Sequence, residues 1–231
     1  MSETRRSDQP DAFPMHRLEA FSDGVFAFAV TLLVVSLDVP RSAQELFAAM
    51  RDFLGFGICF AFLVLIWISH VRFFRDYPLA DRRMVGLNMV LLFVVLLFVY
   101  PMKFLFSVLA SELLGQHVQQ AIGSLDEVRT LMQIYGLGFL ALYASKLLMH
   151  LHVRSRGEIL DLTPKQRLAL SGSTRQQAIM IGIAAVSIAI ARFTQDDGRY
   201  SGCVYLLIAP LLTANGHWTR RLAAGVDKAS A

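Results

Sequence analysis

Long hydrophobic runs, separated by short polar and basic segments, make up most of this 231-residue chain. Six runs of 18 to 26 residues can be distinguished. At about 1.5 Å per residue, each would cross roughly 30 Å of hydrocarbon as an α-helix. The pattern therefore predicts an all-α integral membrane protein with six transmembrane helices. The predicted spans are Met15–Val39, Phe53–Phe74, Met84–Leu109, Leu131–Val153, Gln176–Phe193 and Tyr200–Trp218.

Polar segments at the two ends of the chain frame these spans. Residues 1–14 are polar and predict a disordered cytoplasmic tail. No small-residue cleavage site follows a short apolar core, so we expect the first span to remain as a helix. Residues 15–218 are expected to form one six-helix domain, followed by a second cytoplasmic tail over 219–231. Pro101 and Pro210 fall inside spans, where proline kinks a helix locally.

Basic residues are distributed unevenly between the two sides of the predicted bundle. With a cytoplasmic N-terminus, fourteen of the 22 Lys and Arg residues flank the spans on the cytoplasmic side, and four lie on the opposite side. Short cytoplasmic loops of membrane proteins carry such an excess of positive charge. We therefore expect both termini in the cytoplasm and a multi-pass protein of the cell membrane.

The composition supports a membrane class and argues against nucleic acid as a partner. Charged residues make up 17% of the chain and hydrophobic residues 55%, whereas soluble domains have about 25% charged residues. The net charge of +4 comes from basic residues in short loops, without the interleaved aromatic residues of a nucleic-acid surface. Cys59 and Cys203 lie inside apolar runs, where small core residues are expected rather than a disulfide or a metal site.

No motif of enzymatic chemistry is found along the chain. It has no P-loop, no glycine-rich nucleotide motif, no Cys-x-x-Cys and no Ser/His/Asp order. His150 and His152 would diverge on a helix, which favours a surface role over metal binding. We therefore expect no enzyme activity, no cofactor and no small-molecule substrate.

The first span contains an acid, Asp23, about two turns inside its start. A carboxylate in hydrocarbon is costly, so such a residue is a functional-site candidate. At about 100° per residue, Leu32 and Val35 each lie within roughly 40° of Phe28, and Asp23 lies about 140° away from Phe28. One face of this helix can thus be directed toward a central axis, while Asp23 packs against other helices of the same subunit.

A buried Asp23 would need hydrogen-bond donors. The sequence places several polar side chains at the same depth, near the cytoplasmic ends of the first three spans. One interpretation is a single hydrogen-bonded network that fixes the first helix to the second and third. The other is a set of ordinary polar residues near a membrane surface. The residues concerned are Arg17, Ser22, Asp23, Trp67, His70 and Asn88.

The start of the first span resembles the first-helix signature of the transmembrane protein 175 potassium channels. The motif reads Arg-x-x-x-Phe-Ser-Asp and continues as Gly-Val-Phe-Ala-x-Ala-x-Thr-Leu-Leu. The end of the second span and the start of the third also resemble this family, and the resemblance covers essentially the whole chain as one six-helix unit. Its positions here are Arg17, Phe21, Ser22, Asp23, Trp67, His70, Leu87 and Asn88.

The resemblance implies a homotetramer in a lipid bilayer, with the first helix of each subunit lining a central pore that passes potassium. Phe28 falls where the family usually has Ile or Leu as the narrowest hydrophobic constriction. Leu32 and Val35 match further apolar rings, and Thr31 matches a polar position beside them. The signature residues match positions that support the helix rather than touch the ion.

Selectivity in such a pore has to arise without the usual filter. The chain has no Thr-Val-Gly-Tyr-Gly loop, and the pore stripe carries no acidic ring. Dehydration at a narrow apolar ring, assisted by Thr31 hydroxyls or helix carbonyls, predicts a moderate potassium preference. Two other classes stay open: a secondary transporter with a proton relay through Asp23 and His70, and a structural membrane protein without transport.

Overall fold

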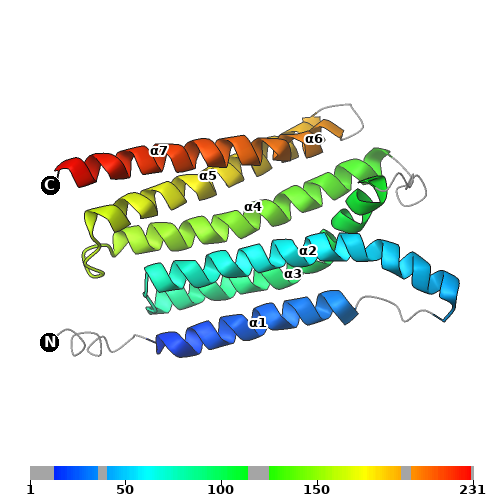
Figure 1. The fold of residues 1–231 in the computed structure, drawn as a ribbon, viewed down its shortest axis with the longest axis horizontal. Helices are drawn as coiled ribbons and strands as arrows, with labels where there is room; N and C mark the ends of the chain where they lie inside the picture. The colour runs from blue at the N-terminus through cyan, green and yellow to red at the C-terminus, as the bar shows by residue number, and fades with distance from the viewer. Residues whose placement is uncertain (1–12, 36–40, 114–124, 194–198, 230–231) are drawn as a thin grey trace. The chain divides into compact units, whose positions relative to one another are not determined.

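A computed structural model describes residues 13–35, 41–113, 125–193 and 199–229, and the regular structure in these ranges is helical (Figure 1). Five of the helices, α1 to α5, are long and apolar enough to cross a membrane, judged by length and composition. The elements are α1 (Met15–Val35), α2 (Ala43–Asp76), α3 (Arg82–Leu113), α4 (Leu125–Ser155), α5 (Pro164–Phe193), α6 (Arg199–Cys203), the 3-10 helix η1 (Val204–Leu207) and α7 (Ile208–Ala229).

Five predicted spans coincide with these helices, and α2 to α5 are longer than the apolar runs. Helix α2 begins ten residues before Phe53, and α5 begins twelve residues before Gln176. Hydropathy marks only the part of a helix that suits hydrocarbon, whereas backbone hydrogen bonding continues into the polar flanks. The end of the first predicted span, residues 36–40, and most of the N-terminal tail lie outside the described residues.

The sixth predicted span, Tyr200–Trp218, is not one α-helix. It begins in α6, passes through η1 and continues in α7, which runs past Trp218 to Ala229. Pro210 has no N–H to donate to the carbonyl of Leu206, and its ring crowds that carbonyl. The α-helical pattern is therefore replaced by a 3-10 turn just before α7, and a sixth membrane crossing stays a prediction.

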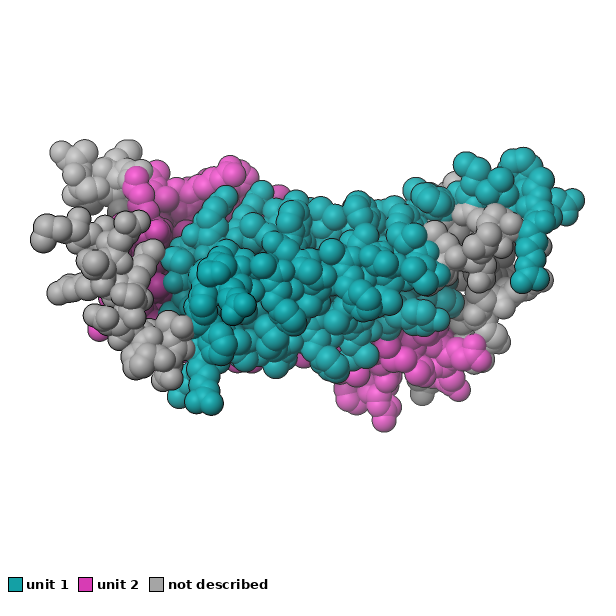
Figure 2. Space-filling model, turned by 90° about the horizontal axis from the view of Figure 1, so that it is seen from below, with its two compact units in different colours: residues 1–121 teal, residues 122–231 magenta. Residues whose placement is uncertain are grey.

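The contacts divide the chain into two compact units, residues 1–121 and residues 122–231 (Figure 2). Unit 1 contains α1, α2 and α3, and unit 2 contains α4 to α7. The hydropathy pattern gives no sign of this division, because it does not record which helices pack against one another.

In unit 1, α1 packs against both α2 and α3, and the backbones of α2 and α3 approach closely. A Cβ atom added at Gly55 would lie 2.7 Å from the Ser107 Cα. The backbone N–H of Phe13 donates to the carbonyl of Ala80, at 2.9 Å, and so ties the start of α1 to the α2–α3 connection. At the start of α3, the Asp81 side chain accepts from the backbone N–H of Met84.

We expect Gly55→Ala to destabilise the protein. The added methyl group would meet backbone atoms of α3, so the helices must separate, and such overpacking costs about 1–3 kcal/mol. Gly57→Ala is a matched control, because a Cβ at Gly57 meets nothing within 4 Å and alanine is the better helix former. Melting temperatures of the detergent-solubilised variants test this. Equal melting temperatures for the two variants would contradict the close α2–α3 approach.

In unit 2, α5 packs against α4 and α7. Helix α5 starts with a capping box: the backbone N–H of Thr163 donates to Gln166 Oε1 at 2.9 Å, and the backbone N–H of Gln166 donates to Thr163 Oγ1 at 3.3 Å. Pro164 occupies the first helical position, where no N–H is needed. Gly136 lets α4 approach α5, since a Cβ there would overlap the Ile188 side chain.

Polar side chains on α4 are buried, which corrects the expectation for its two histidines. His150 and His152 are 5% and 9% exposed, so neither has the surface role that their spacing suggests. His150 Nδ1 lies 2.7 Å from the carbonyl oxygen of Lys146, and the Lys146 Nζ lies 5.6 Å from the centre of the Tyr143 ring. Hydrogen bonding and ring contacts within α4 therefore accommodate these groups.

Candidate functional site: the two faces of the first helix

One face of α1 is buried against α2 and α3. Its buried residues are spaced by three or four positions, so they form a single stripe along the helix. This stripe fixes which side of α1 faces its own subunit. The buried residues are Leu18, Ser22, Phe26, Ala29 and Leu33.

The opposite face of α1 is apolar and exposed in the single chain. Phe28 is 55% exposed and Val35 72% exposed, and Leu32 and Thr31 are exposed beside them. The Thr31 hydroxyl donates to the carbonyl of Ala27 in its own helix, at 3.0 Å. All four residues expected to line a pore therefore lie on the side of α1 that its own unit leaves uncovered; their role in conduction stays a prediction.

A chain of hydrogen bonds connects the buried face of α1 to α3 and α2. Ser22 Oγ donates to the carbonyl of Leu18 at 2.8 Å, so it accepts from Asn88 Nδ2 at 2.9 Å. Asn88 Oδ1 then faces His70 Nε2 at 2.7 Å, which makes Nε2 the donor. Ser22 and Asn88 are fully buried, and His70 is 3% exposed. The donor and the acceptor of each hydrogen bond are thus defined, and each of these buried polar side chains has a partner.

Aromatic rings enclose this chain. The His70 ring lies 5.5 Å from the Phe26 ring and 4.9 Å, edge to face, from the Phe74 ring, measured between centroids. In the connection that follows α2, the Tyr77 ring lies 5.7 Å from the Phe73 ring, measured between centroids, and is tilted by 58° to it. Burial, with the nearby Asp76 charge, raises the pKa of Tyr77 to about 12, so its hydroxyl stays protonated at neutral pH.

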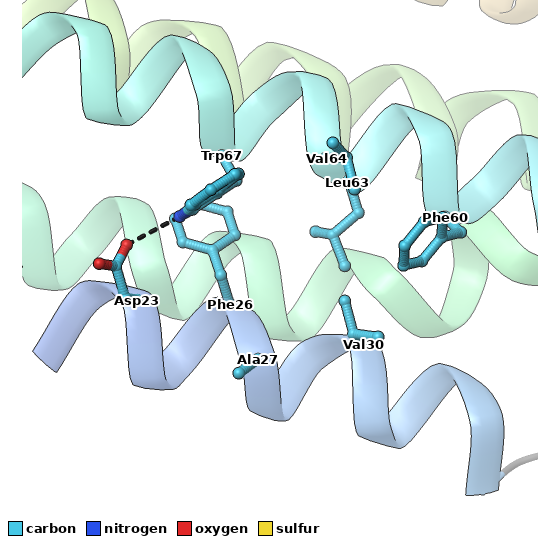
Figure 3. A pocket seen from close by; sticks show the side chains of 8 residues that line it. All are labelled: Asp23, Phe26, Ala27, Val30, Phe60, Leu63, Val64 and Trp67. Carbon is cyan, nitrogen blue, oxygen red and sulfur yellow. Dashed lines mark hydrogen bonds between the residues drawn. The ribbon is translucent and has the colours of Figure 1, made fainter. Parts of the chain in front are cut away.

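Asp23 makes a separate contact with α2. Its Oδ1 accepts a hydrogen bond of 2.7 Å from Trp67 Nε1 (Figure 3). The two residues stand at one end of an open groove of about 300 Å³ between α1 and α2. The other lining residues are Phe26, Ala27, Val30, Phe60, Leu63 and Val64.

The expectation of a buried Asp23 is wrong for the single chain, because its side chain is exposed. Asp23 lies at the side of the α1–α2 contact, where α2 covers it from one direction only. The hydrogen bonds also form two groups rather than one: Ser22, Asn88 and His70 in the first, Asp23 and Trp67 in the second. Within the described residues, the side chains of Arg17 and Phe21 join neither group.

This separation weighs against a proton relay through Asp23 and His70. His70 Nε2 already donates to Asn88, and Asp23 is bound to Trp67 rather than to His70. A relay would need an acceptor nitrogen facing the carboxylate. Among the described hydrogen bonds, Asp23 and His70 therefore belong to separate groups.

The residues of α2 that line one side of the groove were not predicted from the sequence. Phe60, Leu63, Val64 and Trp67 follow the i, i+3, i+4, i+7 spacing of one helix face. This spacing is present in the sequence. Because the second span is apolar on all sides, however, these positions cannot be distinguished from the rest of the helix.

We expect Asp23→Ala to lower the melting temperature by removing the acceptor of the Trp67 indole N–H. A hydrogen bond to a charged group contributes about 1.5–3 kcal/mol when buried, and exposure of this pair reduces that to about 1 kcal/mol. Asp23→Asn keeps an oxygen that accepts the bond and should lose less. Melting and assembly state of both variants are the measurements. Asp23→Ala that melts and assembles as wild type would show that the contact does not support the helix.

Five long apolar helices and a first helix anchored on one face define a multi-pass α-helical membrane protein. Residues 17–98 match the family model described as endosomal/lysosomal potassium channel TMEM175. A protein of Marivirga tractuosa described as a potassium channel is 33% identical over 223 residues, covering 89% of this chain and 87% of the relative. The chain therefore belongs to the TMEM175 family.

Other relatives and solved structures agree. A Streptomyces collinus protein described as a potassium channel is 32% identical over 133 residues, which cover 55% of this chain and 62% of the relative. The crystal structure of a variant of the potassium channel MtTMEM175 is similar with a TM-score of 0.78 at 32% identity, over 94% of this chain and 96% of the other. A TMEM175 homologue from Chamaesiphon minutus, at 24% identity, has the same fold with a TM-score of 0.59 over 87% of this chain and 97% of that one.

Proposed function

We propose that this protein is a potassium-permeable, moderately selective cation channel. The observation that carries the proposal is the division of α1 into an anchored face and an uncovered apolar face. An apolar face that a membrane helix leaves uncovered in its own subunit faces either lipid or further copies of the chain, and around a shared axis it would line the permeation path. The relatives, which are described as potassium channels, support the same function.

The assembly belongs to this proposal. Four copies would place their α1 helices around one axis, each held by its own Ser22–Asn88–His70 chain, and the anchored faces would point outward. Phe28 would then form the narrowest ring, with Leu32 and Val35 beyond it and Thr31 offering hydroxyl oxygens beside it. An apolar constriction controls permeation by dewetting, and a partly dehydrated cation pays less when it is large and weakly hydrated, which favours potassium over sodium.

The orientation is part of the same proposal: six crossings, both termini in the cytoplasm and insertion in the cell membrane. Its support in unit 1 is the hydrogen bond between Phe13 and Ala80, which brings the start of α1 to the α2–α3 connection. That connection is flanked by Arg75, Arg82 and Arg83, so the basic segments of unit 1 gather at one end.

Reconstitution into planar bilayers tests the proposal. A channel gives unitary currents carried by potassium, with a moderate permeability ratio over sodium. Saturable flux without unitary currents would indicate a transporter, and a folded protein with neither would indicate a structural role. Imaging of the solubilised protein should show four-fold particles with α1 at the centre; particles with Phe28 facing lipid would overturn the pore assignment.

A further inference from the structure

A basic and aromatic surface lies on α7, in unit 2. Ala214, His217, Trp218 and Arg221 line a shallow cleft of about 330 Å³. Their i, i+3, i+4, i+7 spacing places them on one helix face. Trp218 is 63% exposed, a large value for an indole, and Arg221 is exposed beside it.

Contacts between α5 and α7 turn this face away from α5. Arg175 donates from Nε to Asn215 Oδ1 at 3.1 Å and from Nη2 to Thr219 Oγ1 at 3.0 Å. A Cβ at Gly172 would lie 2.7 Å from Thr219 Oγ1, so the two helices approach closely there. At about 100° per residue, the cleft face lies roughly 130° from the face that bears Asn215 and Thr219.

Three arginines at this end of unit 2 have no carboxylate partner among the described side chains: Arg175, Arg220 and Arg221. Arg175 is held by neutral oxygens only. A guanidinium fork suits the oxygens of a phosphate, and tryptophan is enriched at the level of lipid headgroups.

We infer that the His217–Trp218–Arg221 cleft binds the phosphate of an anionic phospholipid headgroup. Arg221 pairs with the phosphate, and the Trp218 indole lies against the glycerol and upper acyl region. The lipid is the chosen source because basic segments beside membrane spans attract anionic lipids. Its assignment to the cytoplasmic leaflet rests on the proposed orientation, whereas the phosphate chemistry is independent of ion conduction.

Fluorescence quenching tests this site, since the chain has two tryptophans, Trp67 and Trp218. Trp67→Phe leaves Trp218 as the reporter. In phosphatidylcholine nanodiscs, a small fraction of brominated phosphatidylglycerol should quench Trp218 more than the same fraction of brominated phosphatidylcholine does. The complementary Trp218→Phe variant, which reports from Trp67, should show no preference between the two lipids.

Two arginine variants locate the binding. Arg221→Gln should weaken the preference for phosphatidylglycerol about fivefold, which corresponds to about 1 kcal/mol per basic residue at a membrane surface. Arg220→Gln is the matched control: it removes the same charge one residue away, outside the cleft, and should keep most of the preference. Equal losses would indicate general charge attraction and overturn the site.

Further measurements distinguish lipid phosphate from free phosphate, and a loss of binding from a loss of folding. Excess inorganic phosphate should not compete with the lipid; competition would assign the cleft to a free anion instead. In wild-type protein, phosphatidylglycerol should raise the melting temperature above that in phosphatidylcholine, and Arg221→Gln should abolish the difference. Equal quenching by both lipids in a protein that conducts would refute the lipid site while leaving the channel proposal intact.

Discussion

Phe28→Ala is expected to raise potassium flux through the reconstituted protein by on the order of tenfold, which is a fall of about 1.4 kcal/mol in the barrier. Phe28 is 55% exposed on the uncovered face of α1, and truncation of this ring widens the apolar constriction and favours its wetting. Unitary conductance and open probability in planar bilayers measure the effect. Phe28→Leu, with a side chain of intermediate size, should give an intermediate flux.

The control is a second exposed phenylalanine of the same unit. Phe93 lies on α3 and is 66% exposed, so Phe93→Ala removes a comparable ring without touching α1. Its flux should equal that of wild type. A Phe28→Ala variant that assembles normally and conducts as wild type would show that the constriction lies elsewhere.

Asn88→Leu should give the largest loss of stability, about 2–4 kcal/mol, seen as a large drop in melting temperature. The substitution keeps the volume of a fully buried side chain but removes the amide that joins Ser22 to His70. The His70 Nε2–H is then buried without its acceptor, and a lost buried partner costs far more than an average hydrogen bond contributes.

A double-mutant cycle provides the control for Asn88. Ser22→Ala alone leaves the Asn88 amide without its acceptor, so Ser22→Ala and Asn88→Leu share part of their cost. The combined variant should therefore lose less stability than the two single losses together. Strict additivity would mean that Ser22 and Asn88 stabilise the protein independently, contrary to the continuous chain of hydrogen bonds.

The apolar runs predict helices well because hydropathy and helical length are properties of single segments. Five spans coincide with described helices for this reason. The sixth was wrong as a single helix, because the consequence of Pro210 depends on the backbone geometry that precedes it. The limits of α2 and α5 were also missed, since their polar flanks continue helical hydrogen bonding outside the hydrocarbon-like part.

Five of the six polar residues expected at this site, all but Arg17, take part in its hydrogen bonds, but their connections could not be predicted from the sequence. The depth of Ser22, Trp67, His70 and Asn88 follows from span positions, and the helical projection separates Phe28 from Asp23. Which donor meets which acceptor depends on the rotation of each helix about its axis, and a few tens of degrees decide that. Thus the single network divides into two groups, and Asp23 stays exposed at the side of the α1–α2 contact.

The Ser22 anchor restricts how α1 can move. Phe28 lies six positions after Ser22, which is about 9 Å of helix rise. Rotation of α1 about its axis by one residue would break the hydrogen bond between Ser22 and Asn88 and turn the buried stripe away from α2 and α3. Rotation of the whole of α1 about its axis would therefore cost the most free energy of the ways to widen the pore. We expect the pore to widen through a change in the rotamer of Phe28 or through bending of α1 after Ser22, while the first two turns of α1 stay in place.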